Sequence, residues 1–426
     1  MIPDIVRAAV ARDAAATLLA RSAALARCTD KPGEILRTFL SSAMEEVHQC
    51  MRPWFEAAGM TVSVDRAGNL RGFYPAASGK DSPRLLIGSH LDTVPNAGAY
   101  DGVLGVLMGL ALVEALSRRK MPYAIEVIGF SDEEGTRFGV PFIGSRAIVD
   151  QLNGAILDSK DADGVTVCAA LSGYSATHPE LVEPLLAPGA AAYLEFHIEQ
   201  GPVLESRDLA LGIVEALAGQ SRCHLLFQGR AGHAGTTPMA LRRDALAAAA
   251  EWMTRIEVIA CSFEGLVATV GQIHADPGGV NVIPGIVRCS LDVRHRNDAV
   301  RNDALKTILD EAHIVASRRG ISVEAEEYHT QPAVHLDPTM ISIAETAAHD
   351  AGYASISMTS GAGHDAMVIA PHLPSAMVFL RNPGGISHHP DESVLETDVA
   401  AAIHMGRCFL DEFALFLNKK ESDPRV

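Results

Sequence analysis

The sequence predicts an α/β fold divided between two domains, and three observations support this prediction. The chain has 426 residues, which exceeds the size at which one hydrophobic core usually stops growing. From residue 84 onward, β-type runs alternate with a helix-length run, as in a largely parallel sheet. Near residues 213–220 the pattern changes to alternating β-type segments with an Ala-rich helix. We therefore expect one domain from 1–213 and 331–426, with a second domain inserted at 214–330.

The N-terminal segment, from about residue 5 to 60, carries Ala, Leu and Val at helical spacing. The pattern is interrupted at Lys31-Pro32-Gly33 and at Arg52-Pro53, where we expect helices to break. This segment is predicted to be a helical scaffold.

A strand, helix and strand follow from residue 84. They are the runs RLLIGS, GVLGVLMGLALVEAL and AIEVIGFS. In open sheets of this kind, ligands bind at the carboxyl ends of the strands. The segments HLDTV and SDEEG fall at those ends, so the sequence places a candidate site there.

The inserted block contains β-type segments and one Ala-rich helix, namely SRCHLLFQG, DALAAAAEWMTRIE, LVATVGQI and IVRCSLDVRH. The chain then returns with apolar runs at 366–371 and 376–380. They lead into GGISHHPDE and a last helix expected at about 396–418. These segments complete the first domain.

Composition narrows the class of protein. Hydrophobic residues make up 48% and charged residues 20%, as in an ordinary globular enzyme. A net charge of −17 opposes binding to nucleic acid or to anionic lipid.

The sequence also bears on the compartment. The longest apolar stretch, near 102–116, contains Glu114, so we expect no membrane span. Asp4 and Asp13 interrupt the apolar residues at the N-terminus, so we expect no signal peptide. Seven cysteines without a C-x-x-C pair favour reduced thiols and a cytoplasmic protein.

Five segments supply residues of the metal-ligand type. They are His90 in GSHLDTV, Asp101 in AYDGV, Glu133-Glu134 in SDEEG, His197 in FHIEQG and His388-His389 in GISHHP. Imidazole with carboxylate suits zinc and, less exclusively, manganese, cobalt or nickel. Each segment alone is a weak signal, because a single histidine is more often a surface or satisfied polar residue.

Local context strengthens two of these segments. Asp92 follows His90 by two residues, a spacing that lets its carboxylate hold the second imidazole nitrogen. A solvated acidic turn would also explain Glu133-Glu134, but a β-type run precedes them. Adjacent carboxylates on an extended chain point to different sides, so one can bind metal while the other accepts a proton.

The chain resembles the hydantoinase/carbamoylase branch of the M20 metallopeptidase-like amidohydrolases, over nearly its whole length. The motifs on which this resemblance rests occur in the family's order and are GSHLDTV, YDGVLGV, FSDEEGTRFG, FIGSRA, EFHIEQGPVLE, GRAGHAGTTPM, NVIPG, DVRH, SGAGHDA and GGISHHPDE. The resemblance implies a phosphorylase/hydrolase-like α/β catalytic domain with an inserted α+β, ferredoxin-like domain that serves as lid and dimerisation domain. It also implies two divalent metal ions per subunit, zinc foremost, and a carbamoyl or ureido carboxylate as substrate.

The resemblance assigns roles to the ligand-type residues. Asp101 bridges the metals, with His90 and His197 on one ion and Glu134 and His388 on the other, and Glu133 is the general base. His389 competes with His388, which we prefer because the family's ligand directly follows the serine. His197 before Ile-Glu-Gln-Gly resembles the carbamoylase branch, whereas related exopeptidases usually present a carboxylate there.

Further residues match the family's substrate site. Arg294 and Asn281 match the binders of the substrate carboxylate, a task that suits a bidentate cation. His233 matches a histidine that enters the active site of the other subunit and stabilises the oxyanion, which implies a homodimer formed through the inserted domain. Gln200, Gly361 and Gly363 are weaker candidates for substrate contacts. His364 is expected to be either a supporting donor or a structural residue.

The expected reaction is hydrolysis of N-carbamoyl-L-amino acids to amino acid, ammonia and carbon dioxide. Allantoate and N-carbamoyl-β-alanine remain open as substrates, and the sequence does not choose the metal. A metallo-exopeptidase is the second alternative, and a catalytically silent binding relative is the third, although mere binding has no need of Glu133. Because Arg294 and Asn281 lie in a different predicted domain from the metal ligands, we expect closure about hinges near 213 and 330.

Overall fold

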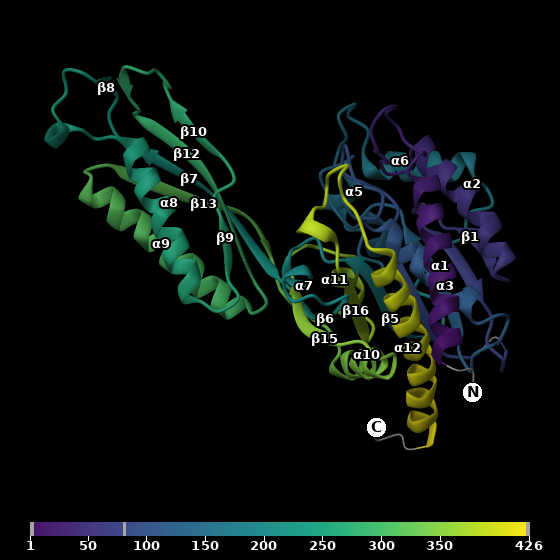
Figure 1. The fold of residues 1–426 in the computed structure, drawn as a ribbon. Helices are drawn as coiled ribbons and strands as arrows, with labels where there is room; N and C mark the ends of the chain where they lie inside the picture. The colour runs from purple at the N-terminus through teal and green to yellow at the C-terminus, as the bar shows by residue number, and fades with distance from the viewer. Residues whose placement is uncertain (1–3, 80–81, 423–426) are drawn as a thin grey trace. The chain divides into compact units, whose positions relative to one another are not determined.

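The computed structural model describes residues 4–79 and 82–422 (Figure 1). The chain forms two compact units. The larger unit contains Met1–Glu215, Leu336–Met358 and Gly363–Val426, and the inserted unit contains Ala216–His335 and Thr359–Ala362. The roles of catalytic domain and lid that we assign to these units remain predictions.

Two helices begin the larger unit, α1 (Asp4–Leu25) and α2 (Ser42–Ala57). The expected interruption at residues 31–33 lies between them, but the break expected at Arg52-Pro53 is wrong, because α2 continues through Pro53. Val47, Met51 and Phe55 recur at every fourth position of α2 and are fully buried. Burial of this face outweighs the hydrogen bond that a helical proline removes.

The nine-stranded sheet is mixed rather than largely parallel. In the described residues its nine strands include the path β1-β2-β4-β3-β5-β16-β6-β14, with β15 paired to β6. The neighbouring strands β4, β3, β5 and β16 pair in parallel, whereas the pairs β1–β2, β2–β4, β16–β6 and β6–β14 are antiparallel. The strands are β1 (Thr61–Val64), β2 (Leu70–Tyr74), β3 (Arg84–His90), β4 (Ala124–Phe130), β5 (Ala190–Ile198), β6 (Leu211–Leu217), β14 (Val334–His335), β15 (Ser355–Ser360) and β16 (Ser375–Leu380). The short turn between β1 and β2 allows only an antiparallel pair, which the strand alternation near residue 84 could not reveal.

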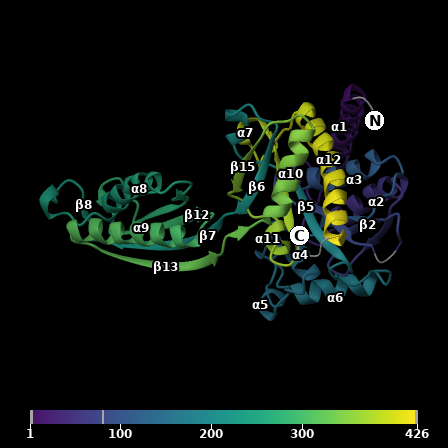
Figure 2. The same ribbon diagram turned by 90° about the horizontal axis from the view of Figure 1, so that it is seen from below.

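Helices cover both faces of this sheet (Figure 2). One face carries α1, α3 (Val103–Ala115), α10 (Pro338–Asp350) and α12 (Glu396–Ser422). The opposite face carries α4 (Ile143–Ile148), α5 (Gly154–Leu157), α6 (Val167–Thr177) and α11 (Ala366–Ile369). Helix α3 is apolar on all sides and is buried from Val103 to Val113. It is the centre of the core, packed between the sheet and the helices α1 and α12.

The inserted unit has two layers. Its sheet has the order β10-β12-β7-β13, with β9 paired to β12, and its helices are α8 (Ala245–Ser262) and α9 (Asp298–Arg318). The strands are β7 (Gly219–Gln228), β9 (Val267–Thr269), β10 (Ile273–Asp276), β12 (Ile286–His295) and β13 (Ser322–Gln331). Alternate residues of β7, namely Cys223, Leu225 and Phe227, join the core with Trp252 of α8. A separate two-stranded ribbon consists of β8 (Gly232–His233) and β11 (Val282–Ile283).

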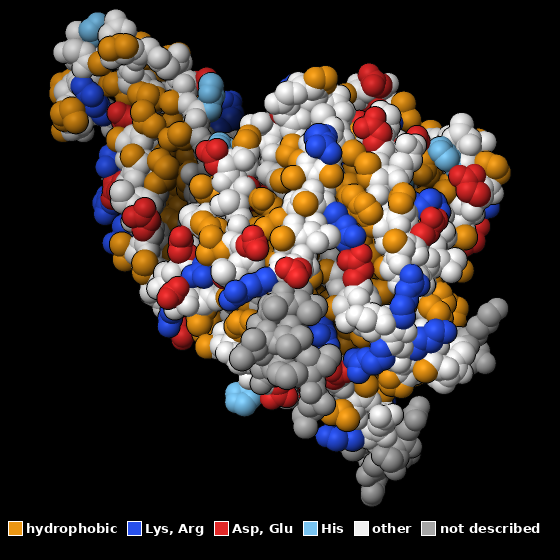
Figure 3. Space-filling view, turned by 45° about the vertical axis from the view of Figure 1, so that its right-hand side comes forward, with side chains coloured by type: hydrophobic (Ala, Val, Ile, Leu, Met, Phe, Trp, Pro, Cys, Tyr) orange, Lys and Arg blue, Asp and Glu red, His pale blue; other side chains and the backbone are white. Residues whose placement is uncertain are grey.

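Acidic and basic side chains are interspersed on the face shown in Figure 3. Among the described residues, no helix combines the length and the apolar character needed to cross a bilayer.

Candidate metal centre

All five predicted ligands lie at the carboxyl ends of the central parallel strands or in the loops that follow them. His90 ends β3, and His197 is the penultimate residue of β5. Asp101 lies in the loop between β3 and α3, Glu134 in the bend after β4, and His388 in the loop after β16. Because these strand ends share one edge of the sheet, residues far apart in sequence meet there.

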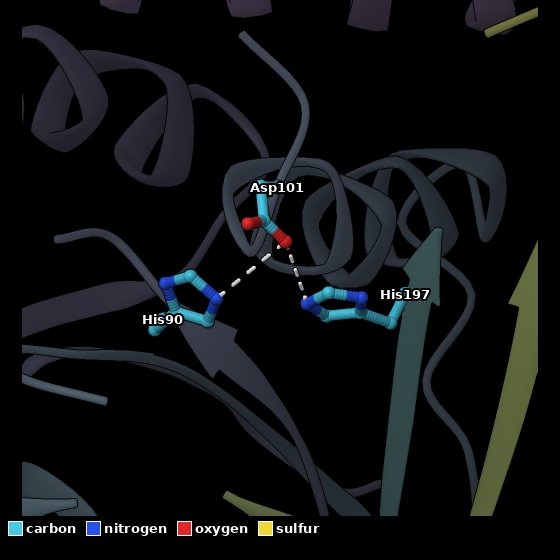
Figure 4. Close-up of side chains that lie close together, drawn as sticks. All are labelled: His90, Asp101 and His197. Atoms are coloured by element: carbon cyan, nitrogen blue, oxygen red, sulfur yellow. Dashed lines mark ion pairs between the residues drawn. The ribbon is translucent and has the colours of Figure 1, made fainter. Parts of the chain in front are cut away.

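His90 and His197 face the Asp101 carboxylate (Figure 4). Nδ1 of His90 lies 3.0 Å from the carbonyl oxygen of Asp92, and Nδ1 of His197 lies 2.9 Å from that of Ile198. A carbonyl only accepts, so both histidines donate from Nδ1 and keep the Nε2 lone pair free. Nε2 lies 4.0 Å from Asp101 Oδ1 in His90 and 3.2 Å in His197.

The second carboxylate oxygen of Asp101 faces another group. His388 Nε2 lies 3.2 Å from Asp101 Oδ2 and 3.4 Å from Glu134 Oε1. Asp101 is thus common to two potential metal-binding groups, one with His90 and His197 and one with Glu134 and His388. The neighbouring His389 is exposed, and its Nδ1 lies 3.6 Å from Asp391.

The two adjacent glutamates reach the same cluster. Residues 131–134 do not form a strand, so the extended backbone expected at the two glutamates is absent. One carboxylate oxygen of Glu133, one of Glu134 and one nitrogen of His90 lie within 4.8 Å of one another. Glu133 is buried, at 7% exposure.

Asp92 positions this bend. One carboxylate oxygen accepts the N–H of Glu133 at 2.9 Å, and the other accepts that of Glu134 at 3.1 Å. This carboxylate lies 3.6 Å from His90 Nδ1, so the imidazole hydrogen bond goes to the carbonyl of Asp92 instead of the predicted carboxylate. The side chain of Asp92 therefore connects the His90 loop to the glutamates.

The electrostatics of the site favour cations. Burial raises the pKa of Glu134 to about 7 and lowers the pKa of His197 to about 4. Burial, followed by the charges of Glu134 and Asp365, raises the pKa of Glu133 well above its ordinary value. Burial opposes the charged form of His90, but the charges of Asp92 and Asp101 outweigh it and raise the pKa of His90 to about 9. The carboxylates thus create a field that attracts positive charge, either a proton on His90 or a divalent cation that imidazoles and carboxylates can bind.

One buried nitrogen atom without a hydrogen-bond partner also supports a metal ion at this site. Nε2 of His197 is buried and has no hydrogen-bond partner among the described residues. A buried polar atom of this kind is uncommon without a ligand or ion to satisfy it. His90, Asp101, Glu134, His197 and His388 thus fit a divalent metal centre.

Three weaker candidates lie at different places. The side-chain amide of Gln200 donates to Asp101 Oδ1 at 3.1 Å and to Ser387 Oγ at 3.0 Å. A Cβ at Gly363 would lie 2.8 Å from the Phe142 ring and 3.7 Å from Glu133 Oε1, so this glycine permits the close approach of Phe142 next to that carboxylate. The carbonyl oxygen of Gly361 accepts from Arg294 Nη1 at 2.6 Å.

The remaining substrate-site candidates belong to the inserted unit. His233 and Asn281 are exposed neighbours, because β8 pairs with β11 and the N–H of Ala234 donates to the carbonyl of Asn281 at 2.9 Å. Arg294 lies on the sheet face opposite α8 and α9, where Nε and Nη2 contact the two carboxylate oxygens of Asp292 at 2.8 and 3.0 Å. This pair holds the guanidinium in a fixed orientation.

Sequence reasoning missed two residues that support the site. Arg37, from the loop before α2, is buried and donates from Nε to the carbonyl of Leu91 at 2.8 Å. Glu392 accepts the N–H of Asp101 at 3.0 Å. The motif GGISHHPDE contains Glu392, but nothing in the sequence shows that it contacts the Asp101 loop. His364, expected to be either a supporting donor or a structural residue, packs edge-on against His197 with ring centroids 4.4 Å apart.

Imidazoles and carboxylates at the carboxyl edge of an α/β sheet are a donor set that metal-dependent hydrolases use. A family described as Peptidase family M20/M25/M40 matches residues 86–412. The chain belongs to this family and is a metal-dependent amidohydrolase.

Two relatives and one solved structure specify the branch. Allantoate deiminase 1 of Glycine max is 37% identical over 418 residues, which cover 90% of this chain and 86% of that protein. N-carbamoyl-L-amino acid amidohydrolase of Geobacillus stearothermophilus is 37% identical over 371 residues, covering 86% and 90%. A hydantoinase/carbamoylase family amidase from Burkholderia multivorans has a TM-score of 0.87 and 31% identity, covering 93% of this chain and 97% of that one. The resemblance inferred from the motifs is confirmed.

Proposed function

We propose that this enzyme hydrolyses the linear ureido C–N bond of N-carbamoyl-L-amino acids, releasing amino acid, ammonia and carbon dioxide. The observation that carries the proposal is Asp101, whose two oxygens face two separate ligand groups. A carboxylate placed in this way can bridge two cations. The histidine at position 197, in the context FHIEQG, favours the carbamoylase branch over the exopeptidases.

His90 and His197 would hold one ion, Glu134 and His388 the other, and Asp101 both. Zinc is proposed first, with manganese, cobalt or nickel as alternatives for the same donors. When bound, such ions polarise the substrate carbonyl and lower the pKa of a water molecule.

Glu133 is the proposed general base. Its carboxylate lies beside the ligands but is not needed to complete either ligand group around Asp101. Burial raises its pKa, which makes it a stronger proton acceptor than an exposed glutamate. Glu133 takes the proton from the attacking water and returns it to the leaving nitrogen, while Asp92 holds the Glu133 main chain in place. The carbamate left by this cleavage then collapses, so that amino acid, ammonia and carbon dioxide are the final products.

The substrate carboxylate is assigned to Arg294 and Asn281, with Gln200, Gly361 and Gly363 as further contacts. Arg294 offers a guanidinium whose orientation is fixed by Asp292. His233 is proposed as the oxyanion donor of the partner subunit's site.

A homodimer through the inserted unit is part of this proposal. Met239 and Leu241, close in sequence to His233, are 76% and 73% exposed, and Val280, next to Asn281, is fully exposed. Apolar side chains are visible at the end of the unit that carries β8 (Figure 3). Exposed apolar groups of this kind are typical of a surface that another subunit covers. We also propose a cytoplasmic location, which suits seven free cysteines.

Allantoate is the second candidate substrate, favoured by the similarity to allantoate deiminases. Allantoate and N-carbamoyl-amino acids both combine a ureido group with a carboxylate. N-carbamoyl-β-alanine differs in the distance between these two groups.

Ammonia release from these three ureido substrates, measured beside cleavage of a dipeptide, tests the proposal. We expect the highest kcat/KM with an N-carbamoyl-L-amino acid, and little dipeptide cleavage. If allantoate is turned over faster than the N-carbamoyl-L-amino acids, allantoate is the substrate instead. Preferential dipeptide cleavage would indicate an exopeptidase, and no turnover of any substrate with added Zn²⁺, Mn²⁺ or Co²⁺ would favour a silent binding relative.

A further inference from the structure

A buried carboxylate connects two loops of the candidate metal centre. Glu392 is 5% exposed. Its Oε1 accepts the main-chain N–H of Tyr100 at 2.8 Å and that of Asp101 at 3.0 Å. Its Oε2 accepts the hydroxyl of Ser387 at 3.2 Å. Glu392 thus holds the loop that carries Asp101 and the residue directly before His388.

The packing around this carboxylate leaves it little freedom. A Cβ placed on Gly98 would collide with Cβ, Cδ and Oε1 of Glu392. The Asp101 loop therefore passes against the glutamate side chain, and the absence of a side chain at position 98 permits this approach.

Ser387 extends the connection. Its hydroxyl lies 3.4 Å from Asp101 Oδ2 and accepts the side-chain amide of Gln200 at 3.0 Å. His388 follows with a φ of 56°, which is uncommon for a residue other than glycine and requires support from its surroundings. The hydrogen bonds of Ser387 with Glu392 and Gln200 hold the backbone directly before His388 in place.

We propose that Glu392 is a positioning residue that fixes Asp101 and His388 in the geometry required for metal binding. It does so through two hydrogen bonds to the Asp101 loop and one to Ser387, without contributing a ligand atom itself. The inference rests on the proposed metal centre and adds a residue that determines metal affinity.

Three substitutions test whether Glu392 positions the metal ligands or has a structural role only. Glu392→Ala removes all three hydrogen bonds, and loss of such partners of metal ligands typically weakens metal affinity about 10- to 100-fold. Glu392→Gln keeps an oxygen for the N–H groups of Tyr100 and Asp101 and offers an N–H to Ser387. The metal affinity of this variant should therefore lie between those of wild type and Glu392→Ala. Gly98→Ala displaces the carboxylate without removing it and should weaken affinity in the same direction as Glu392→Ala.

The matched control is Asp391→Ala, which removes a carboxylate from the adjacent, exposed position. Zn²⁺ binding to the metal-free full-length protein is measured by isothermal titration calorimetry well below the unfolding temperature. The absorption spectrum of the Co²⁺-loaded protein reports the ligand geometry in parallel. His388→Ala serves as the reference for loss of a ligand.

We expect Asp391→Ala to bind Zn²⁺ like wild type, and Glu392→Ala to bind it 10- to 100-fold more weakly with an altered Co²⁺ spectrum. Unchanged affinity and spectrum in Glu392→Ala and Gly98→Ala overturn the inference, even if the thermal stability falls, because the residue would then be structural only. If His388→Ala itself binds metal like wild type, the proposed centre is wrong and the positioning role falls with it.

Discussion

Replacing Glu133 by glutamine tests the division of labour between the two adjacent glutamates. The change keeps the volume and a hydrogen-bonding oxygen in a buried position but removes the ability to accept a proton. Asp101 with His90 and His197, and Asp101 with Glu134 and His388, form the two ligand groups without Glu133. Metal content should therefore persist, while kcat falls by about 10²- to 10⁴-fold, the usual contribution of a general base.

The matched variant is Glu134→Gln, one residue along the same bend. Glu134 Oε1 lies 3.4 Å from His388 Nε2, so this change should reduce metal content as well as turnover. Metal per chain is measured by inductively coupled plasma mass spectrometry, and ammonia release gives kcat. Turnover within a few-fold of wild type in Glu133→Gln would refute the general-base assignment, and loss of metal in that variant would refute the separation of roles.

Three further predictions follow from other parts of the molecule. Arg294→Ala should raise KM about 10- to 100-fold with a smaller change in kcat, because hydrogen bonds to charged groups contribute about 1.5–3 kcal/mol. A steady-state assay, with Arg288→Ala as the exposed control, measures both constants. An unchanged KM would exclude Arg294 as the binder of the substrate carboxylate. Chelation should lower the free energy of unfolding by on the order of 4 kcal/mol for each of the two ions, relative to protein with free metal at a thousand times Kd; calorimetric unfolding curves that coincide with and without chelator would contradict this. Burial lowers the pKa of His48 from 6.5 to about 4, so stability present above pH 6.5 should be lost as the pH falls to 4, by roughly 3 kcal/mol. Urea unfolding at several pH values should show a weaker acid loss in His48→Met but not in the exposed His349→Gln, and equal losses in both would refute the assignment to His48.

Sequence patterns predicted the elements whose periodicity is strong. The run at residues 102–116 is helix α3, and RLLIGS and AIEVIGFS are the adjacent parallel strands β3 and β4. The antiparallel flanks were missed because their direction depends on turn geometry and on pairing across the sheet. The break at Pro53 was wrong, because local propensity does not register how deeply Met51 and Phe55 are buried.

The candidate ligands could be found from the sequence because each follows a predicted strand or lies in a family motif. Their mutual distances could not, since His90, His197 and His388 are brought together only by the strand order of the sheet. The same limit applies to Glu392, whose role depends on its contact with a loop nearly three hundred residues earlier. Asp92 was found, but its carboxylate binds the main chain of the glutamates rather than the imidazole.

Asp101 and the two ligand groups around it are proposed to hold two divalent ions that the hydrolysis requires. The most direct test adds Zn²⁺ or Mn²⁺ stepwise to metal-free protein while ammonia release from an N-carbamoyl-L-amino acid is followed. We predict that activity rises from near zero and reaches a plateau at two equivalents per chain. Full activity in the metal-free protein, or a plateau at one equivalent, would contradict the account.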